Sequence, residues 1–109
     1  MIPYSNAVLT AITGVGVSGD YDTAATVGTN RWTGTSSIYV AEEILEELQA
    51  GELNQVQRTR LEIPHGVGKQ IKRGDTLTYT YDSGTQTGVA GTLAHAPLVD
   101  RVKVLLEDR

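Results

Sequence analysis

Two histidines and several carboxylates are the side chains of this sequence that could take part in catalysis or bind a metal ion. His65 and His95 lie thirty residues apart, each beside proline or small residues. No serine–histidine–aspartate pattern and no pair of carboxylates surrounds them, so neither nucleophilic nor acid–base catalysis is indicated. Two histidines alone also fall short of a metal site. We interpret both as loop residues that form hydrogen bonds, and we do not expect an enzyme.

The other candidate metal ligands are acidic. Asp20 and Asp22, with the glutamates of residues 42–47, supply oxygen atoms that a hard cation could use. A calcium loop needs more oxygen ligands at regular spacing and a closing glutamate, and that pattern is missing. The sequence has no cysteine, which excludes a disulfide, a thiolate zinc site and a catalytic thiol. We therefore expect solvated charge at these carboxylates, and no cofactor.

Two short motifs match known binding signatures. Residues 14–19 have the glycine spacing of dinucleotide-binding loops. Such a loop must run directly into a helix, and the residues that follow have no helical stripe, so a flexible glycine hairpin explains them better. Arg73, Gly74 and Asp75 spell an adhesion motif. Because glycine and aspartate also suit a turn that introduces a strand, we prefer that interpretation.

Length and composition favour one small β-rich domain. The 109 residues are enough for a single domain, 1–109, with a modest core. Twelve glycines and many threonines favour strands and turns over helices. A net charge of −4 argues against a free-standing nucleic-acid binder. No apolar run approaches the ~20 residues that cross a bilayer, and the first residues do not resemble a signal peptide. The absence of cysteine fits a reducing cytoplasm, although many secreted proteins also lack cysteine, and no membrane contact is expected.

Residues 57–81 are the most regular part of the sequence. Two alternating runs flank a connection that contains Pro64 and Gly66. Alternation with period two is typical of strands that bury one face. The predicted inward faces are Thr59, Leu61 and Ile63 in the first run and Leu77, Tyr79 and Tyr81 in the second. We expect these strands to form the centre of a small barrel or sandwich.

Further strands are predicted on both sides of this centre. They cover residues 4–13, 37–41, 89–94 and 100–107. In the first of them Val8 and Ile12 are expected to share a face, and in the last Val102, Val104 and Leu106 are expected to point inward. A long glycine-rich loop is predicted over 14–34 and a hairpin loop over 82–88. The total is five or six short strands that can pair mostly antiparallel.

One segment has a different period. Ala41, Ile44, Leu45 and Leu48 recur at the spacing of a short amphipathic helix over 42–50. Gly51 stands where a C-terminal cap belongs, and residues 52–56 are expected to be loop. The predicted fold is therefore mainly β: a small antiparallel β-barrel or sandwich of SH3- or OB-like size, with one short helix and long loops.

Charges of opposite sign gather in two parts of the sequence. Glutamates fill the predicted helix, and a basic cluster follows it, made of Arg58, Arg60, Lys69, Lys72 and Arg73. Separate acidic and basic poles suit head-to-tail association, in which the patch of one subunit meets that of the next. Ordinary surface charge is the alternative, and the sequence alone does not decide between them.

The order of these features resembles the head-closure, or stopper, proteins of the head-to-tail connector in long-tailed bacteriophages. The matching pieces are SSIYVAEEI, QRTRLEIPHG, IKRGDTLTYTY and VAGTLAHAPLVDRVKVLLED, which together span most of residues 35–108. The glycine-rich stretch at 14–34 departs from the shorter hairpin that is usual in the family. The resemblance covers the pattern of strands and turns rather than a catalytic motif.

The resemblance implies a structural virion protein of the phage neck, assembled in the host cytoplasm. Such proteins form a homo-oligomeric ring, commonly of twelve subunits, between the portal-adaptor protein and the tail terminator or tail tube. Packaged DNA passes through the channel without sequence-specific binding. The family's lumen loop corresponds here to residues 42–56, with Glu42, Glu43, Glu46, Glu47 and Glu52. Negative charge in that position would keep DNA phosphates from adhering.

Two alternatives remain. The chain could be an adaptor or tail-terminator protein of the same particle, or a small cytoplasmic β-barrel module that binds a peptide or an oligonucleotide. Salt-sensitive binding of single-stranded DNA would favour the module.

Overall fold

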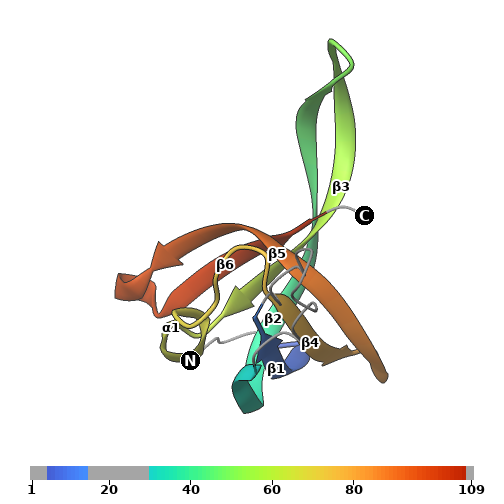
Figure 1. The fold of residues 1–109 in the computed structure, drawn as a ribbon. Coiled ribbons are helices and arrows are strands. Elements are labelled where there is room, and N and C mark those ends of the chain that lie inside the picture. The colour runs from blue at the N-terminus through green and yellow to red at the C-terminus, as the bar shows by residue number, and fades with distance from the viewer. Residues whose placement is uncertain (1–4, 15–29, 108–109) are drawn as a thin grey trace, which may run out of the picture.

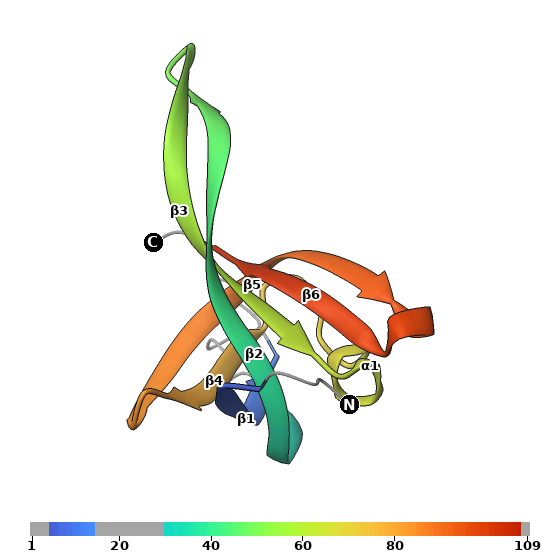
Figure 2. The ribbon, with the colours of Figure 1, turned by 180° about the vertical axis from the view of Figure 1, so that it is seen from behind.

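The computed structural model describes residues 5–14 and 30–107, which form six strands and two short helical segments (Figures 1 and 2). The strands are β1 (Ala7–Thr13), β2 (Asn30–Gln49), β3 (Glu52–Ile63), β4 (Thr76–Tyr81), β5 (Gly84–Ala96) and β6 (Arg101–Leu106). The helical segments are α1 (His65–Gly68) and the 3-10 turn η1 (Pro97–Val99). No helix in these ranges is long and apolar enough to cross a membrane. Most of the predicted loop over 14–34 lies outside the described residues, and its last part already belongs to β2.

The strands close into an antiparallel barrel in the order β1-β2-β3-β6-β5-β4. Two long strands make closure possible because each pairs with one neighbour along its first part and with a different neighbour along its second part. β2 pairs with β1 through residues 30–38 and with β3 through residues 39–49. β5 pairs with β4 first and then, past a bulge between Ala90 and Thr92, with β6. The predicted mainly β fold with one short helix is confirmed.

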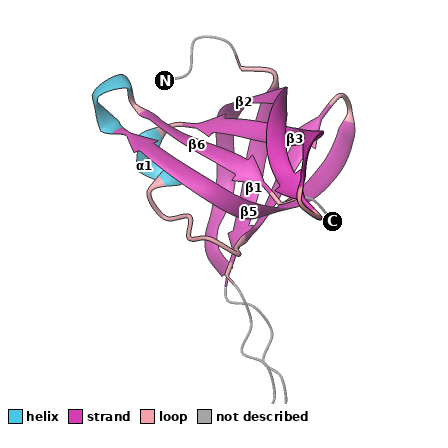
Figure 3. Cartoon of the chain, turned by 90° about the horizontal axis from the view of Figure 1, so that it is seen from above, coloured by secondary structure: helices cyan, strands magenta, loops and turns pink. Residues whose placement is uncertain are grey.

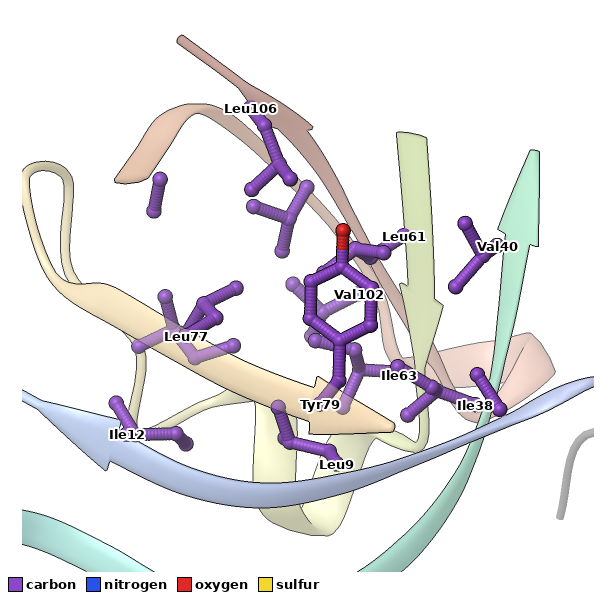
Figure 4. Close-up of a cluster of buried hydrophobic side chains, with 14 residues drawn as sticks. Leu9, Ile12, Ile38, Val40, Leu61, Ile63, Leu77, Tyr79, Val102 and Leu106 are labelled. Carbon is purple, nitrogen blue, oxygen red and sulfur yellow. The ribbon is translucent and has the colours of Figure 1, made fainter. Parts of the chain in front are cut away.

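The core lies inside this ring and contains side chains from every strand (Figure 4). Leu61, Ile63 and Leu77 are fully buried, as the alternation predicts. Val102, Val104 and Leu106 of β6 also point inward, which confirms the expected face. The remaining buried apolar residues are Ala7, Leu9, Ile12, Ile38, Val40, Ile71, Tyr79 and Ala90. Tyr81, at the end of β4, is partly exposed and does not belong to this core.

The predicted face of β1 is wrong because the strand contains a bulge. Its pairing with both β2 and β4 shifts between Leu9 and Ala11. The extra residue changes which side chains point inward. As a result Leu9 and Ile12 are both buried, while Val8 is exposed at the surface.

The predicted helix over 42–50 is also wrong. Residues 42–49 continue β2, which pairs with β3 without a break from Tyr39–Glu62 to Gln49–Glu52. Ala50 and Gly51 make the two-residue turn between them, and both have a positive φ (52° and 83°), as tight hairpins require. Residues 52–56, predicted as loop, belong to β3. The short helix of this fold is instead α1, which follows Pro64.

The second hairpin is tighter than its composition predicts. Only Asp82 and Ser83 separate β4 from β5, with φ of 51° and 62°. The predicted loop over 82–88 therefore ends at residue 83, since threonine-rich residues 84–88 extend β5.

Candidate functional site: the projecting arm

Residues 42–59 of β2 and β3 leave the barrel as a two-stranded arm (Figures 1 and 2). β2 pairs with β1 only as far as Ile38, and the Asn6 side chain covers one more step by exchanging two hydrogen bonds with the backbone of Val40. β3 pairs with β6 only from Arg60 onward. Among the described residues, no strand therefore pairs with either outer edge of the arm. Two-stranded ribbons are marginal in isolation, so side chains must stabilise this one.

One face of the arm, the charged face, carries Glu43, Glu47, Arg58 and Arg60. Arg58 donates from Nη2 to both carboxylate oxygens of Glu47, at 2.7 Å each. Arg60 Nη1 donates to Glu43 Oε1 at 2.9 Å. These are cross-strand pairs on one side of a ribbon, a geometry that links the two strands directly.

The ion pairs continue from the arm onto the barrel. Arg60 Nη2 lies 3.5 Å from Glu62 Oε2, and Arg101 Nη1 lies 3.0 Å from Glu62 Oε1. Glu62 is almost completely buried (7% exposed) although it points away from the core. The flanking arginines compensate for the cost of removing this carboxylate from water. A continuous row of alternating charges therefore anchors the base of the arm.

The opposite face, the apolar face, exposes three large aliphatic side chains. Ile44, Leu48 and Leu53 have exposed fractions of 70%, 71% and 69%. Leu48 and Leu53 are directly opposite each other in the ladder, so they form one patch near the tip. Exposed aliphatic side chains that gather in one place commonly mark a contact surface.

The five glutamates predicted for a lumen loop divide between these two faces and the tip. Glu43 and Glu47 are neutralised by arginines on the charged face. Glu42 lies on the apolar face, where it accepts a hydrogen bond from the Thr59 hydroxyl at 3.1 Å. Within the described ranges, no ion pair involves Glu42, Glu46 or Glu52. The negative charge of the arm that is not internally compensated therefore lies on the apolar face and at the tip.

The base of the arm is electrostatically linked to the core. Burial and, next, the negative charge of Glu42 raise the pKa of Tyr79, which is only 5% exposed. Tyr79 also borders an open depression of about 280 Å³ at this end of the barrel, together with Gln57, Thr59 and Gln86. No described group of three or more histidine or carboxylate side chains could hold a metal ion.

The five predicted basic residues lie in different surroundings. Arg58 and Arg60 are bound to glutamates of their own chain, because β2 and β3 pair in a register that places opposite charges across the ribbon. Lys69 ends α1, at the far end of β3 from the arm. Arg73 borders a small depression that also includes Glu47 and Arg58. The prediction of separate acidic and basic poles is thus wrong for Arg58 and Arg60.

The adhesion motif has a structural role. Asp75 is fully buried, and its Oδ2 accepts hydrogen bonds from Arg31 Nε at 2.8 Å and from the Lys72 backbone N–H at 2.9 Å. Its backbone pairs with Ala90, which ties the α1–β4 connection to β5. A carboxylate engaged in this way cannot be presented to a receptor.

The two histidines meet although they are distant in the sequence. The His65 and His95 rings are in edge contact, with centroids 6.3 Å apart. The His65 backbone N–H donates to the carbonyl oxygen and to Oδ1 of Asp100, at 3.3 Å and 3.1 Å. These contacts join α1 to the η1–β6 junction. The prediction that both histidines are loop residues is wrong, because His65 begins α1 and His95 lies in β5.

The exposure of Ile44, Leu48 and Leu53 was not predicted from the sequence. Ile44 and Leu48 were expected in the apolar stripe of an amphipathic helix, and Leu53 was expected in a loop. The sequence does contain a signal for a hairpin here. Glutamates precede Ala50 and Gly51 and arginines follow them, so a hairpin that turns at these two residues would place opposite charges on neighbouring strands.

Comparisons with protein-family models, curated proteins and solved structures found no match to this chain.

Proposed function

We propose that this chain is a structural subunit of a ring in the neck of a long-tailed bacteriophage, where it retains packaged DNA and joins head to tail. The sequence resemblance over residues 35–108 suggests this role. Its partners would be further copies of itself, a portal-adaptor protein on the head side and a tail terminator or tail tube on the tail side.

The observation that carries the proposal is the arm itself. A domain whose core is complete inside a closed barrel has no internal use for a ribbon that stands clear of it and exposes Ile44, Leu48 and Leu53. Such a ribbon becomes useful when other molecules pack against it. The arm also occupies residues 42–59, which include the 42–56 segment that corresponds to the family's lumen loop.

Charge on the arm suits contact with a DNA channel. Glu52 is exposed at the tip of the arm, on the face opposite Ile44 and Leu48. Carboxylates repel phosphates, so DNA would slide past such arms instead of binding to them. Salt-bridged Glu43 and Glu47 would serve a different purpose, since they hold the two strands together.

A stop codon in the gene within its phage tests the proposal. We expect heads that lose their DNA and tails that stay unattached, with both defects repaired when the protein is supplied from a plasmid. DNA-filled, infectious particles at normal yield without the protein would refute the proposal. Genes for portal, capsid and tail tube beside this gene are the expected neighbourhood.

A point substitution tests the role of the arm. Glu52→Lys should lower the yield of DNA-filled particles without changing the isolated fold, because no ion pair within the described residues involves Glu52. Thr85→Lys is the matched control, since it adds a cation on the β4–β5 hairpin, away from the arm. Equal yields from both variants would remove the arm from the mechanism, and salt-sensitive binding of single-stranded DNA by the wild-type protein would favour an oligonucleotide-binding module.

A further inference from the structure

The described residues expose large apolar side chains at two well separated places. One is the apolar face of the arm, with Ile44, Leu48 and Leu53. The other is η1, where Leu98 is fully exposed (101%) and Val99 is 62% exposed. Val8 and Tyr81, the remaining exposed large apolar residues, retain only 37% and 39%. The arm and η1 are therefore the two strongest candidates for burial in an assembly.

These two patches lie at opposite ends of the same pair of strands. β3 begins in the arm and ends at Ile63, which is paired with Val102, and β6 begins at Arg101 directly after η1. Figure 1 shows the arm and the η1 turn pointing away from the barrel in different directions, and Figure 3 shows η1 and α1 together at one end. Because the barrel lies between the patches, one copy cannot cover its own η1 with its own arm.

The charges around the two patches differ. Glu42 and Glu46 border the apolar face, and Glu52 begins β3 at the tip. At the other end Lys69 closes α1, which is bound to the η1–β6 junction through His65 and Asp100. Lys69 is exposed, and within the described part of the chain it forms no ion pair. Asp100, which caps η1, is also at this end, and its Oδ1 accepts a hydrogen bond from the His65 backbone N–H. The apolar face of the arm therefore carries carboxylates, whereas the η1 end offers the exposed ammonium group of Lys69 beside one hydrogen-bonded carboxylate.

We infer that the apolar face of the arm docks on the η1 end of a second copy of this chain. Ile44, Leu48 and Leu53 of one copy cover Leu98 and Val99 of the next, and Glu46 lies toward Lys69. The contact is heterologous, so every copy gives one arm and receives one, and repetition builds the proposed ring when the rotation between neighbouring copies closes. Pairing of two arms face to face is disfavoured, because it would bring Glu42 and Glu46 of both copies together. This inference rests on the proposed ring and specifies the contact that builds it.

The absence of cysteine makes the contact directly testable by disulfide trapping. Full-length Leu48→Cys and Leu98→Cys proteins, carrying different tags, are mixed and mildly oxidised. Docking raises the effective concentration of the two thiols, so disulfide-linked heterodimer should exceed that from a control mixture by about tenfold or more. The control mixture pairs Leu48→Cys with Thr85→Cys, whose thiol lies on the exposed β4–β5 hairpin.

The outcomes separate the inference from the proposed function. Selective cross-linking of Leu48→Cys to Leu98→Cys supports the inference. Cross-linking no better than the control, or Leu48→Cys homodimers in preference, overturns it. If the wild-type protein nevertheless forms rings by native mass spectrometry, the inference fails while the proposed function stands. Normal infectious particles without the gene product would refute the proposed function independently.

A charge exchange gives a second, reagent-free test. Glu46→Lys alone and Lys69→Glu alone should each weaken ring formation, because each places like charges opposite one another. The double variant, Glu46→Lys with Lys69→Glu, should restore assembly toward the wild-type level. Failure of the double variant to recover, with both single variants folded by circular dichroism, would contradict the pairing of these two residues.

Discussion

Arg58 holds Glu47 diagonally across the arm, with Nη2 2.7 Å from each carboxylate oxygen and Nε 3.1 Å from Oε1. The ladder places Glu43 opposite Arg58 and Asn54 opposite Glu47, so the ion pair joins positions that are offset by four residues along the strands. Only 15% of the Arg58 side chain and 32% of the Glu47 side chain are exposed. The planar guanidinium group of Arg58 thus holds the two strands together in an arm that has no hydrophobic core of its own.

Arg58→Ala should loosen the arm while the barrel stays folded. Removing a partly exposed ion pair costs on the order of 1 kcal/mol or less, and that loss falls on a ribbon with no core beneath it. We expect amides of residues 42–59 to exchange faster with deuterium, measured by mass spectrometry, and core amides of β6 to keep their protection. Arg58→Lys, which keeps the charge but loses the fork, should give an intermediate rate; unchanged exchange in the alanine variant would show that backbone pairing alone holds the arm.

Asp75→Ala should destabilise the whole domain. It removes a fully buried carboxylate that binds Arg31 and the Lys72 backbone N–H. Breaking a buried pair from one side costs about 3 kcal/mol or more, which urea denaturation would measure as a lower free energy of unfolding. Arg73→Ala, two residues earlier on the exposed surface, is the control and should change the free energy by less than about 0.5 kcal/mol. Equal effects of both substitutions would contradict the structural role of Asp75.

Two glycines of the same short helix should respond oppositely to alanine. A Cβ added to Gly68 would lie 2.6 Å from Cβ and 2.7 Å from Cγ2 of Val102, and a β-branched side chain cannot turn aside. We expect Gly68→Ala to lower the free energy of unfolding by about 2 kcal/mol. At Gly66 a Cβ meets no atom within 4 Å, so Gly66→Ala should be neutral or stabilise by up to about 1 kcal/mol. Thermal denaturation distinguishes the two, and a neutral Gly68→Ala would mean that β6 can move away from α1.

Ionisation of the Tyr79 hydroxyl should lower the free energy of unfolding at alkaline pH. Burial and then the charge of Glu42 raise its pKa in the folded protein above the ordinary value of 10.0. The folded state therefore binds this proton more tightly than the unfolded chain does, so the contribution is fully present below pH 10.0 and is lost as pH rises through the folded pKa. Tyr79→Phe should lose less stability over that range, as followed by denaturation at several pH values.

Glu42→Gln tests the electrostatic part of the same effect. Removing the carboxylate charge should lower the pKa of Tyr79 toward its ordinary value, visible as earlier tyrosinate absorbance in a pH titration. A titration identical to that of the wild-type protein would mean that burial alone determines this pKa.

Alternation in the sequence was enough to predict the strands that build the barrel. Leu61, Ile63, Leu77, Val102 and Val104 alternate with outward residues, and each lies in the core. A strand with one face in the core and one in water must alternate, so its pattern carries the information locally. Asp82 and Ser83 were likewise recognisable as a turn between two such strands, although not how short it is.

The arm could not be predicted in the same way because it has no buried face. In residues 42–48, glutamates and aliphatic residues come in successive pairs, which gives a repeat of four. That repeat matches an amphipathic helix, but it matches equally a ribbon that shows one glutamate and one aliphatic residue in turn on each face. Helix propensity favours the helix. The ribbon forms because residues 42–49 pair with residues 52–59, and Arg58 of that partner strand binds Glu47.

The sequence by itself thus determined the β class, the barrel strands and the absence of a recognisable catalytic motif. Only the tertiary structure decided which charged side chains form ion pairs within the chain and which stay exposed to solvent. Arg58 and Glu47 are eleven residues apart, and Arg31 and Asp75 are forty-four apart. Whether such residues meet depends on strand register and on barrel closure, which are properties of the whole chain rather than of any local stretch.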